Sequence, residues 1–365
     1  MGASHFQMEL ANLAKCLLLG FMILWIQIHR SKGCFEAERL ALLNFKKFVV
    51  SDGADANHLL SSWVDDSMSD CCKWERVTCN STTSHVIELF LNNTRQLDID
   101  SESFYYDEYI WFIKLSMFQQ LKELRNLNLS YNGIGGFIDY DEGFERLSEL
   151  KKLETLDLSY NNFNDSILSS LGALTSLKSL ILHYNWMEGS FPSKELNNLK
   201  NLETLDLSLN YFNGSLSLEG FERLEDLDIS YNRFNNSILS SLGTLTSLRT
   251  LKIGGNSMEG SLPIQELNNL KNLEILDISG NWFNGFLSLE GFEKLEELDI
   301  SLNGLNSSIL SSLGTLTSLK TLIFRGMPDT KAGSFSMQGM FDFWNCFLGT
   351  HSIRTSNYLA LYCLI

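Results

Sequence analysis

Residues 153–161 read LETLDLSYN, an instance of the pattern LxxLxLxxN that occurs nine times in the chain, sometimes with isoleucine as its third apolar residue. The second leucine of each copy lies 22 to 29 residues from that of the next. A period of this length indicates stacked units, because one unit cannot bury its apolar side alone. These anchor leucines are Leu127, Leu156, Leu180, Leu205, Leu227, Leu251, Leu276, Leu298 and Leu322.

Within each copy, apolar and polar residues alternate. In LDLS, the two leucines would point to one side of a β-strand, and the aspartate and serine to the other. This predicts a coil of parallel strands with a leucine core and an open concave sheet. The last residue of the pattern is expected to turn its amide inward and hydrogen-bond backbone groups. It is Asn132, Asn161, Asn185, Asn210, Asn232, Asn256, Asn281 or Asn303, and Met327 replaces it in the ninth copy.

A longer period is superimposed on the short one. The segment SILSSLGALTSLK begins at Ser166, and near-copies begin at Ser237 and Ser308, a step of 71 residues each time. Three repeats of unequal length were therefore duplicated as a block. Block duplication lengthens a coil without new chemistry, because each repeat contacts only its neighbours. It argues against a single buried catalytic pocket.

Some repeats continue with a Gly-x-apolar-Pro segment, as in Gly189–Pro192 and Gly260–Pro263. With these segments, residues 34–326 resemble plant extracellular leucine-rich repeat proteins, especially receptor-like proteins. The resemblance implies an α/β fold, a leucine-rich repeat solenoid with a parallel concave β-sheet and an N-terminal disulfide cap. The shorter SLEGFE repeats lack the proline and match only the general repeat.

Four cysteines precede the repeats. Cys34 opens the amphipathic run EAERLALLNFKKF, and Cys71, Cys72 and Cys79 follow near Trp74. This arrangement resembles the N-terminal cap of the family, which implies the disulfides Cys34–Cys71 and Cys72–Cys79. Such a cap would cover the open end of the core. Zinc binding is the alternative, but the paired spacing of zinc ligands is missing, so no metal or cofactor is expected.

The chain divides into five predicted parts: a signal peptide at 1–33, the cap at 34–80, a first strand with an acidic, aromatic insert at 86–120, repeats at 121–326 and a divergent tail at 327–365. The apolar run at 16–28 has the length of a signal sequence, with an uncleaved anchor as the alternative. The insert is either a recognition loop or a lateral loop packed on the flank. Compared with the family, the tail indicates a truncated form that lacks a C-terminal membrane span.

Seven N-x-S/T sequons accompany the leader and the cysteines, which together indicate a secreted or apoplastic protein, or the extracellular side of the plasma membrane. A glycan on Asn128 would obstruct one end of the concave sheet. The candidate glycosylation sites are Asn80, Asn92, Asn128, Asn164, Asn213, Asn235 and Asn306.

The net charge of −16 disfavours nucleic acid, because phosphate contacts need clustered basic residues. Part of the acid forms a predicted ladder on the concave face: Asp157, Asp206, Asp228, Asp277 and Asp299. The ladder would either attract a basic partner or hydrogen-bond within the sheet. Exposed aromatic residues on the same face are typical of contacts with a peptide, glycan or protein ligand. The candidate ligand-binding residues are Tyr131, Tyr160, His183, Tyr184, Trp186, Tyr231, Lys252 and Trp282.

No motif of an enzyme is present, and no histidine is predicted to pair with a nucleophile, so no catalytic residue is expected. The favoured hypothesis is ligand recognition in plant defence or developmental signalling, with a co-receptor kinase engaged by the full-length protein. A secreted inhibitor resembling polygalacturonase-inhibiting proteins and a non-functional receptor fragment are the alternatives. Membrane attachment would come only from the missing C-terminal span or an uncleaved N-terminal segment.

Overall fold

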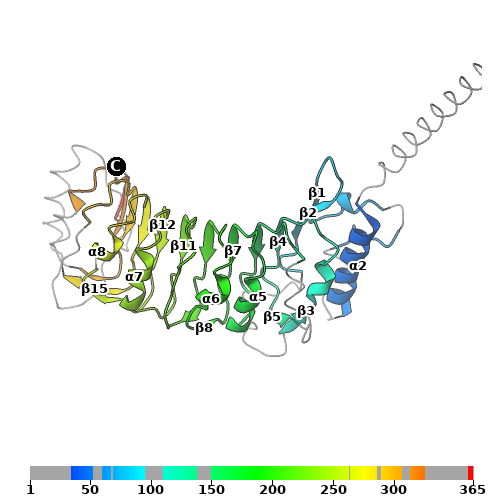
Figure 1. Cartoon of the computed structure of the whole chain (residues 1–365), viewed down its shortest axis with the longest axis horizontal. Helices are drawn as coiled ribbons and strands as arrows, with labels where there is room; N and C mark the ends of the chain where they lie inside the picture. The colour runs from blue at the N-terminus through cyan, green and yellow to red at the C-terminus, as the bar shows by residue number, and fades with distance from the viewer. Residues whose placement is uncertain are drawn as a thin grey trace, which may run out of the picture.

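The computed structural model describes residues 34–51, 60–66, 69–94, 110–137, 149–262, 264–285, 289–305, 313–324 and 361–364. The predicted signal peptide, Asn306, residues 95–109 of the insert and residues 327–360 of the tail lie outside these ranges. The described part forms one elongated, curved coil (Figure 1).

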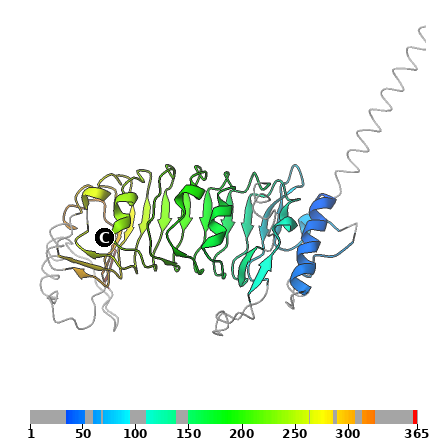
Figure 2. The same ribbon diagram turned by 60° about the horizontal axis from the view of Figure 1, so that its bottom comes forward.

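A twelve-stranded sheet runs along the whole coil, and its strands lie side by side in Figure 2. Each anchor leucine pairs in register with the next, as Leu156 does with Leu180 and Leu227 with Leu251. Terminal strands β1 and β19 pair antiparallel, and the others pair in parallel. In sheet order, the strands are β1 (Val77–Cys79), β2 (Val86–Phe90), β4 (Asn126–Asn128), β6 (Thr155–Asp157), β7 (Ser179–Ile181), β9 (Thr204–Asp206), β11 (Asp226–Asp228), β12 (Thr250–Lys252), β14 (Ile275–Asp277), β16 (Glu297–Asp299), β18 (Thr321–Phe324) and β19 (Leu361–Leu364).

The predicted asparagine bonds are confirmed in every repeat from Asn132 to Asn303. Asn161 is typical: its buried Nδ2 donates to the carbonyls of Leu158 at 3.0 Å and Ser159 at 3.1 Å, and across to Leu129 at 3.0 Å. Its Oδ1 accepts the N–H of Ile134 in the preceding repeat at 3.0 Å. Each amide therefore closes its own bend and joins two repeats. We call this series of amides the asparagine ladder.

The predicted first strand at residue 86 is confirmed as β2, but it was not recognised as part of a repeat. Leu89 of β2 pairs with Leu127, so residues 86–94 form one more repeat at the cap end. Thr94 takes the place of the asparagine, and both its N–H and its hydroxyl donate to Asn132 Oδ1. Val86 replaces the first leucine as well. These two exchanges hid the repeat.

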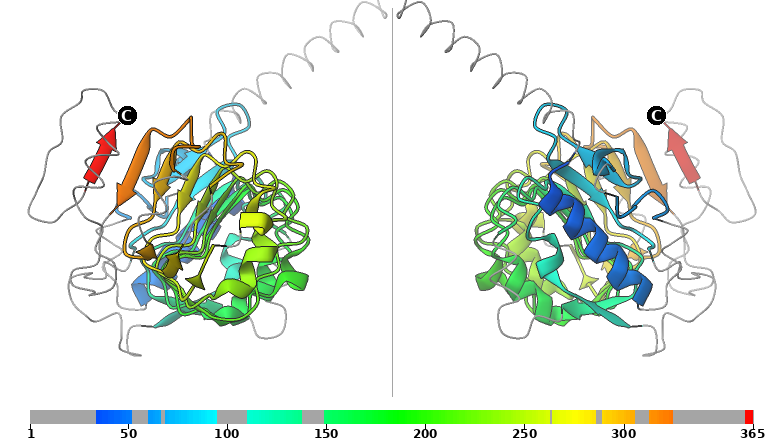
Figure 3. Two further views of the ribbon diagram at one scale, coloured as in Figure 1. Left: turned by 90° about the vertical axis from the view of Figure 1, so that its left-hand side faces the viewer. Right: turned by 90° about the vertical axis from the view of Figure 1, so that its right-hand side faces the viewer.

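The side opposite the long sheet carries short strands and helical turns (Figure 3). They enclose a row of buried aromatic residues that includes Phe163, Phe212, Phe234 and Phe283. The 71-residue block is visible here, because α5, α6, β8 and β10 return as α7, α8, β13 and β15. The elements are β3 (Trp111–Ile113), η4 (Leu115–Phe118), β5 (Ile134–Phe137), η5 (Asp165–Ile167), α5 (Leu168–Leu171), β8 (Glu188–Gly189), α6 (Ser193–Leu196), β10 (Tyr211–Phe212), η6 (Asn236–Ile238), α7 (Leu239–Leu242), β13 (Glu259–Gly260), α8 (Ile264–Leu267), β15 (Trp282–Gly285) and β17 (Gly304–Leu305).

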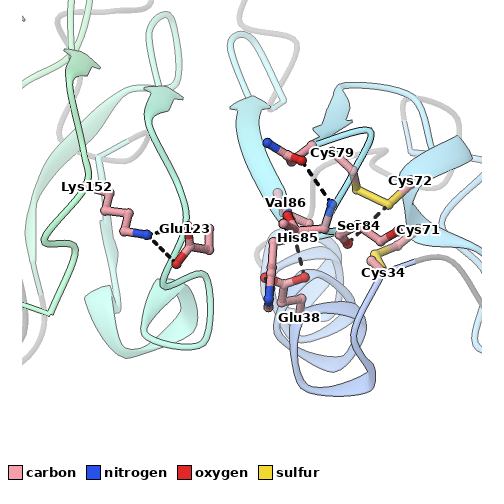
Figure 4. Close-up of polar contacts among 12 residues, drawn as sticks. Cys34, Glu38, Cys71, Cys72, Cys79, Ser84, His85, Val86, Glu123 and Lys152 are labelled. Atoms are coloured by element: carbon pink, nitrogen blue, oxygen red, sulfur yellow. Dashed lines mark hydrogen bonds and ion pairs between the residues drawn. A yellow bond between two sulfur atoms is a disulfide. The ribbon is translucent and has the colours of Figure 1, made fainter. Parts of the chain in front are cut away.

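The cap covers the N-terminal end of the core with helix α2 (Glu36–Ser51) and the turn η1 (Cys71–Lys73). Cys34 is bonded to Cys71 and Cys72 to Cys79, the pairing that the resemblance implied, so these thiols are not zinc ligands. Figure 4 shows both disulfides beside the β1–β2 hairpin, together with the Glu123–Lys152 ion pair of the adjoining repeats.

The visible end of the insert supports the lateral-loop interpretation. Trp111 is buried, its Nε1 donates to the carbonyl of Asn132 at 2.6 Å, and its ring stacks on Phe48 with centroids 5.1 Å apart. Phe112 is exposed. The remaining predicted aromatic residues of the insert lie outside the described residues.

A test of the ladder is Asn232→Ala. The change leaves the carbonyls of Leu207 and Ile229 and the N–H of Phe212 without their buried partner. Since each such group costs about 1–3 kcal/mol, we expect the free energy of unfolding to fall by about 3 kcal/mol or more in urea titrations. The exposed Asn198→Ala serves as the control, and equal stability of the two variants would contradict the ladder.

A second prediction concerns the buried carboxylate of Glu38, which accepts from Val86 N at 3.3 Å and lies 3.0 Å from Nδ1 of His85. Burial raises the pKa of Glu38, although contact with His85 opposes the rise. The folded state then holds this proton more tightly than the unfolded chain, so stability is full below pH 4.5 and falls as the pH rises through the raised pKa. We expect Glu38→Gln to remove the part of the loss in unfolding free energy between pH 4.5 and 7 that comes from ionisation of Glu38. Parallel curves of unfolding free energy against pH for the two proteins would rule out this contribution of Glu38.

Candidate ligand-binding surface

The residues that flank each anchor leucine point out of the core and form the concave face of the long sheet. The anchors are buried, whereas the residues on either side of them are partly accessible. The residue after each anchor forms a row across the strands: Asn128, Asp157, Ile181, Asp206, Asp228, Lys252, Asp277, Asp299 and Ile323.

The aspartates of this row hydrogen-bond within the sheet, as one of the two interpretations predicted. Asp206 Oδ1 accepts from the N–H of Ser208 at 2.9 Å and from its hydroxyl at 2.5 Å. Asp157 and Asp228 bind the serine two residues on in the same way, and Asp277 and Asp299 accept its N–H. One oxygen of each carboxylate therefore closes the bend after the strand.

The other carboxylate oxygens leave this face acidic. Burial raises the pKa of Asp206 and of Asp277, and the charge of the next aspartate in the row, Asp228 or Asp299, adds to the rise. Lys252 lies between the two pairs, and its Nζ is 3.6 Å from Asp228 Oδ2. A cationic group is therefore favoured over these pairs.

Four residues after each anchor, the backbone turns through a positive φ. The positions are Tyr131, Tyr160, Tyr184, Leu209, Tyr231, Gly255, Gly280 and Leu302, with φ between 52° and 64°. We call them the ridge. The rings of Tyr131 and Tyr160 stack with centroids 3.9 Å apart, and those of Tyr160 and Tyr184 at 4.9 Å. Burial, followed by the hydrogen bond to Tyr160, raises the pKa of Tyr131.

His183 lies beside a hydroxyl, but not in the arrangement that activates a nucleophile. Its Nδ1 lies 2.6 Å from Ser208 Oγ and its ring meets Tyr160 edge-on. The serine hydroxyl donates to Asp206, so the histidine nitrogen is the donor in this contact. A nucleophilic serine needs the opposite order, with histidine accepting the hydroxyl proton. Ser159 and Ser230 make the same bond to aspartate without a histidine, so the bond belongs to the sheet.

A second aromatic row directly follows the asparagine ladder. It contains the predicted Trp186 and Trp282, both exposed, and also Tyr211, with the guanidinium of Arg233 4.8 Å from its ring centroid. Tyr211 and Arg233 were missed, although their position after Asn210 and Asn232 is the one that Trp186 and Trp282 occupy. The structure thus brings Tyr131, Tyr160, Tyr184 and His183 into one cluster, while Tyr231, Lys252 and Trp282 lie further along the coil.

The sequons occupy different settings. Asn128 lies on the concave strand β4, and its Nδ2 donates to Asp157 Oδ2 at 2.8 Å, a bond that a glycan on this nitrogen would disturb. Asn164 and Asn235, one block apart, use only Oδ1 to cap η5 and η6 and are exposed.

Residues 95–353 match the family described as "Leucine-rich repeat region", and residues 36–80 match the "Leucine rich repeat N-terminal domain". Receptor like protein 21 of Arabidopsis thaliana is 39% identical over 278 residues, which are 75% of this chain and 22% of the relative. The chain belongs to the plant leucine-rich repeat receptor-like proteins. Receptor-like protein 14 of the same plant is 39% identical over 184 residues, 49% of this chain and 18% of the relative. The chain spans about a fifth of these relatives.

Solved structures agree with this assignment. The crystal structure of PEPR1–AtPEP1 superposes with a TM-score of 0.55 at 25% identity, and the match covers 80% of this chain and 42% of that one. A plant ice-binding protein superposes with a TM-score of 0.52 at 27% identity, and the match covers 76% of this chain and 89% of that one. The predicted fold class, a repeat solenoid with a parallel concave sheet and a disulfide cap, is confirmed. Among the described helices of this family member, none is long and apolar enough for a bilayer.

The ridge of this receptor-like protein allows a matched test. Tyr160→Ala removes two stacked ring contacts and the edge-on contact with His183, and aromatic pairs contribute about 0.5–1.5 kcal/mol each. We expect a loss of about 1–3 kcal/mol in the free energy of unfolding, measured by urea titration. Tyr231→Ala, at the same place one block later, should stay within about 0.5 kcal/mol of wild type because its ring is 60% exposed. An equal loss in both variants would mean that stacking does not hold the ridge.

Proposed function

We propose that this chain supplies the ligand-recognition surface of an extracellular receptor-like protein in plant defence or developmental signalling. The ligand lies on the concave face, across the strands. The protein acts on the extracellular side, in the apoplast or at the plasma membrane. A partner kinase relays the signal.

The observation that carries the proposal is that different residues of each repeat stabilise the fold and form the surface. The anchor leucine and the ladder asparagine are buried and hold neighbouring repeats together, while aromatic rings and carboxylates lie on the outer side of the same strands. Aromatic side chains bury a large area at a low entropic cost, and a rigid support avoids the cost of ordering them on binding. The surface therefore has the composition and the rigidity of a binding site.

A peptide suits this surface better than a glycan does. Sugars pack on open ring faces, but both faces of Tyr160 are covered, by Tyr131 and by Tyr184. The aspartate row favours a basic ligand. Among the similar structures, PEPR1 has AtPEP1 as its partner, and HAESA is in complex with a peptide hormone at 25% identity and a TM-score of 0.53.

The test uses the full chain, made in the bacterial periplasm and immobilised, with a random dodecapeptide phage library as the probe. Disulfides form in that compartment. N-glycans are not added there, so the N-x-S sequons that Asp206→Asn and Asp228→Asn create stay unmodified. We expect enriched peptides to be rich in lysine or arginine. They should bind at least about tenfold more weakly to the double variant Asp206→Asn, Asp228→Asn, since a desolvated ion pair contributes more than 1.4 kcal/mol. Asparagine keeps the Oδ1 acceptor for Ser208 and Ser230, so the fold is preserved.

The control variant is Asp165→Asn, which also removes one carboxylate but lies on the exposed turn η5 away from the concave strands. Peptides that bind all variants equally would contradict the concave site. Inhibition of a microbial polygalacturonase by the full chain, with no selectable peptide, would replace this proposal with the inhibitor alternative.

A further inference from the structure

The duplicated blocks give the chain an internal comparison between β7 and β12, which occupy the same place 71 residues apart. Their inward residues are kept in type: Leu180 and Leu251, Leu182 and Ile253, Asn185 and Asn256, Met187 and Met258. Every outward residue around the strand end differs: Ile181 and Lys252, His183 and Gly254, Tyr184 and Gly255, Trp186 and Ser257. The core is thus retained, while the accessible surface is replaced.

General surface drift does not explain this difference. The preceding repeat changes less: Asp157, Ser159 and Tyr160 return as Asp228, Ser230 and Tyr231, while Thr155 and Asn162 are replaced by Asp226 and Arg233. The exchange is therefore largest between β7 and β12, where all four outward positions around the strand end differ in chemical type. Such a distribution indicates that the outward surface of β12 is adapted to something that β7 does not meet.

The exchange interrupts the ridge. In the first block, Tyr160 stacks on Tyr184, whereas in the second block Tyr231 has Gly255 at the partner's position. The next ridge position is also glycine, Gly280 in place of Leu209. We call Gly255 and Gly280 the glycine gap. Tyr231 on one side is 60% exposed and Leu302 on the other side is 43% exposed.

The ring of Tyr231 leans over the gap. A Cβ built on Gly255 would lie 2.7 Å from Cδ1 of Tyr231, and one on Gly280 would lie 3.2 Å from the backbone nitrogen of Gly255. Trp282, 62% exposed, follows the ladder asparagine of the Gly280 repeat. At the glycine gap the backbone is therefore bare of side chains, and the exposed side chains of Tyr231, Trp282 and Leu302 lie around it.

Carboxylates lie beside the gap on the concave side. A Cβ on Gly254 would lie 3.0 Å from Asp277 Oδ1, so the side chain of Asp277 reaches along the gap. Asp277 and Asp299 are direct neighbours on β14 and β16, and within the described residues no ion pair involves either of them. Burial and the neighbouring Asp299 charge raise the pKa of Asp277, which a cation at this place would reverse.

We propose that the glycine gap is a subsite for one aromatic side chain of an extended peptide ligand, with a lysine or arginine one or two residues away that pairs with Asp277 and Asp299. This inference rests on the proposed function and names the ligand class. The ligand ring stacks on Tyr231, as the chain's own Tyr184 stacks on Tyr160. The spacing fits, because strands lie about 4.8 Å apart and an extended peptide advances about 3.3 Å per residue.

The experiment fills the gap with the residues of the first block. Gly255→Tyr and Gly280→Leu, made separately, reproduce Tyr184 and Leu209, which hold the same backbone at φ 55° and 52°. Thermal unfolding of both variants establishes that they fold. The control is Thr244→Ala, which likewise restores a first-block residue, Ala173, but at an exposed position just beyond α7.

The probe is a random dodecapeptide phage library selected on the full chain. We expect the recovered peptides to share an aromatic residue one or two positions from a lysine or arginine. Each filled variant should bind synthetic copies at least tenfold more weakly, and Thr244→Ala should bind them as wild type does. Replacing the aromatic residue of the peptide by alanine should have the same effect as filling the gap.

Two results would overturn the inference in different ways. Peptides that depend on Asp206 and Asp228 but bind the filled variants at full strength would remove the subsite and leave the proposed function intact. Recovery of no peptide that depends on the concave face would remove both. If one of the two filled variants does not fold, the peptide affinity of the other filled variant decides.

Discussion

Everything on the concave face depends on the buried amides of the asparagine ladder. Where the chain leaves each strand, two backbone carbonyls and one N–H would otherwise be buried without partners, and one amide binds all of them, as Asn210 does. Because the amide joins two repeats, the spacing of the strands is set from inside. The outward side chains then have no part in closing the bend, except for the aspartates, which bind the following serine.

This separation explains how the chain can vary its surface without altering its fold. The blocks repeat the leucines, the ladder and the buried phenylalanines, and they exchange the outward residues of β7 for those of β12. The ridge backbone tolerates tyrosine, leucine or glycine alike at positive φ. A repeat built this way can exchange its outward residues without losing its inward contacts.

The periodic part of the structure was predictable from the sequence because a period is a redundant signal. The anchors and the ladder were expected, hydrogen bonding of the aspartates within the sheet was one of two interpretations, and the family resemblance implied the disulfides. The Leu89 repeat was missed because valine and threonine replace two of its signature residues. Tyr211 and Arg233 were missed although their position relative to the ladder could have revealed them. The contact of His183 with Ser208 could not be predicted, because it depends on which side chains meet across strands rather than along them.

The central claim, that the fold is held from inside while the outward residues are free to serve binding, is tested by one exchange. The variant Lys252→Ile, Gly254→His, Gly255→Tyr, Ser257→Trp gives β12 the outward surface of β7, and its free energy of unfolding is compared with that of Asn256→Ala. The account predicts that the fourfold variant stays within about 1 kcal/mol of wild type while the single ladder variant loses about 3 kcal/mol. A fourfold variant as unstable as Asn256→Ala would contradict it.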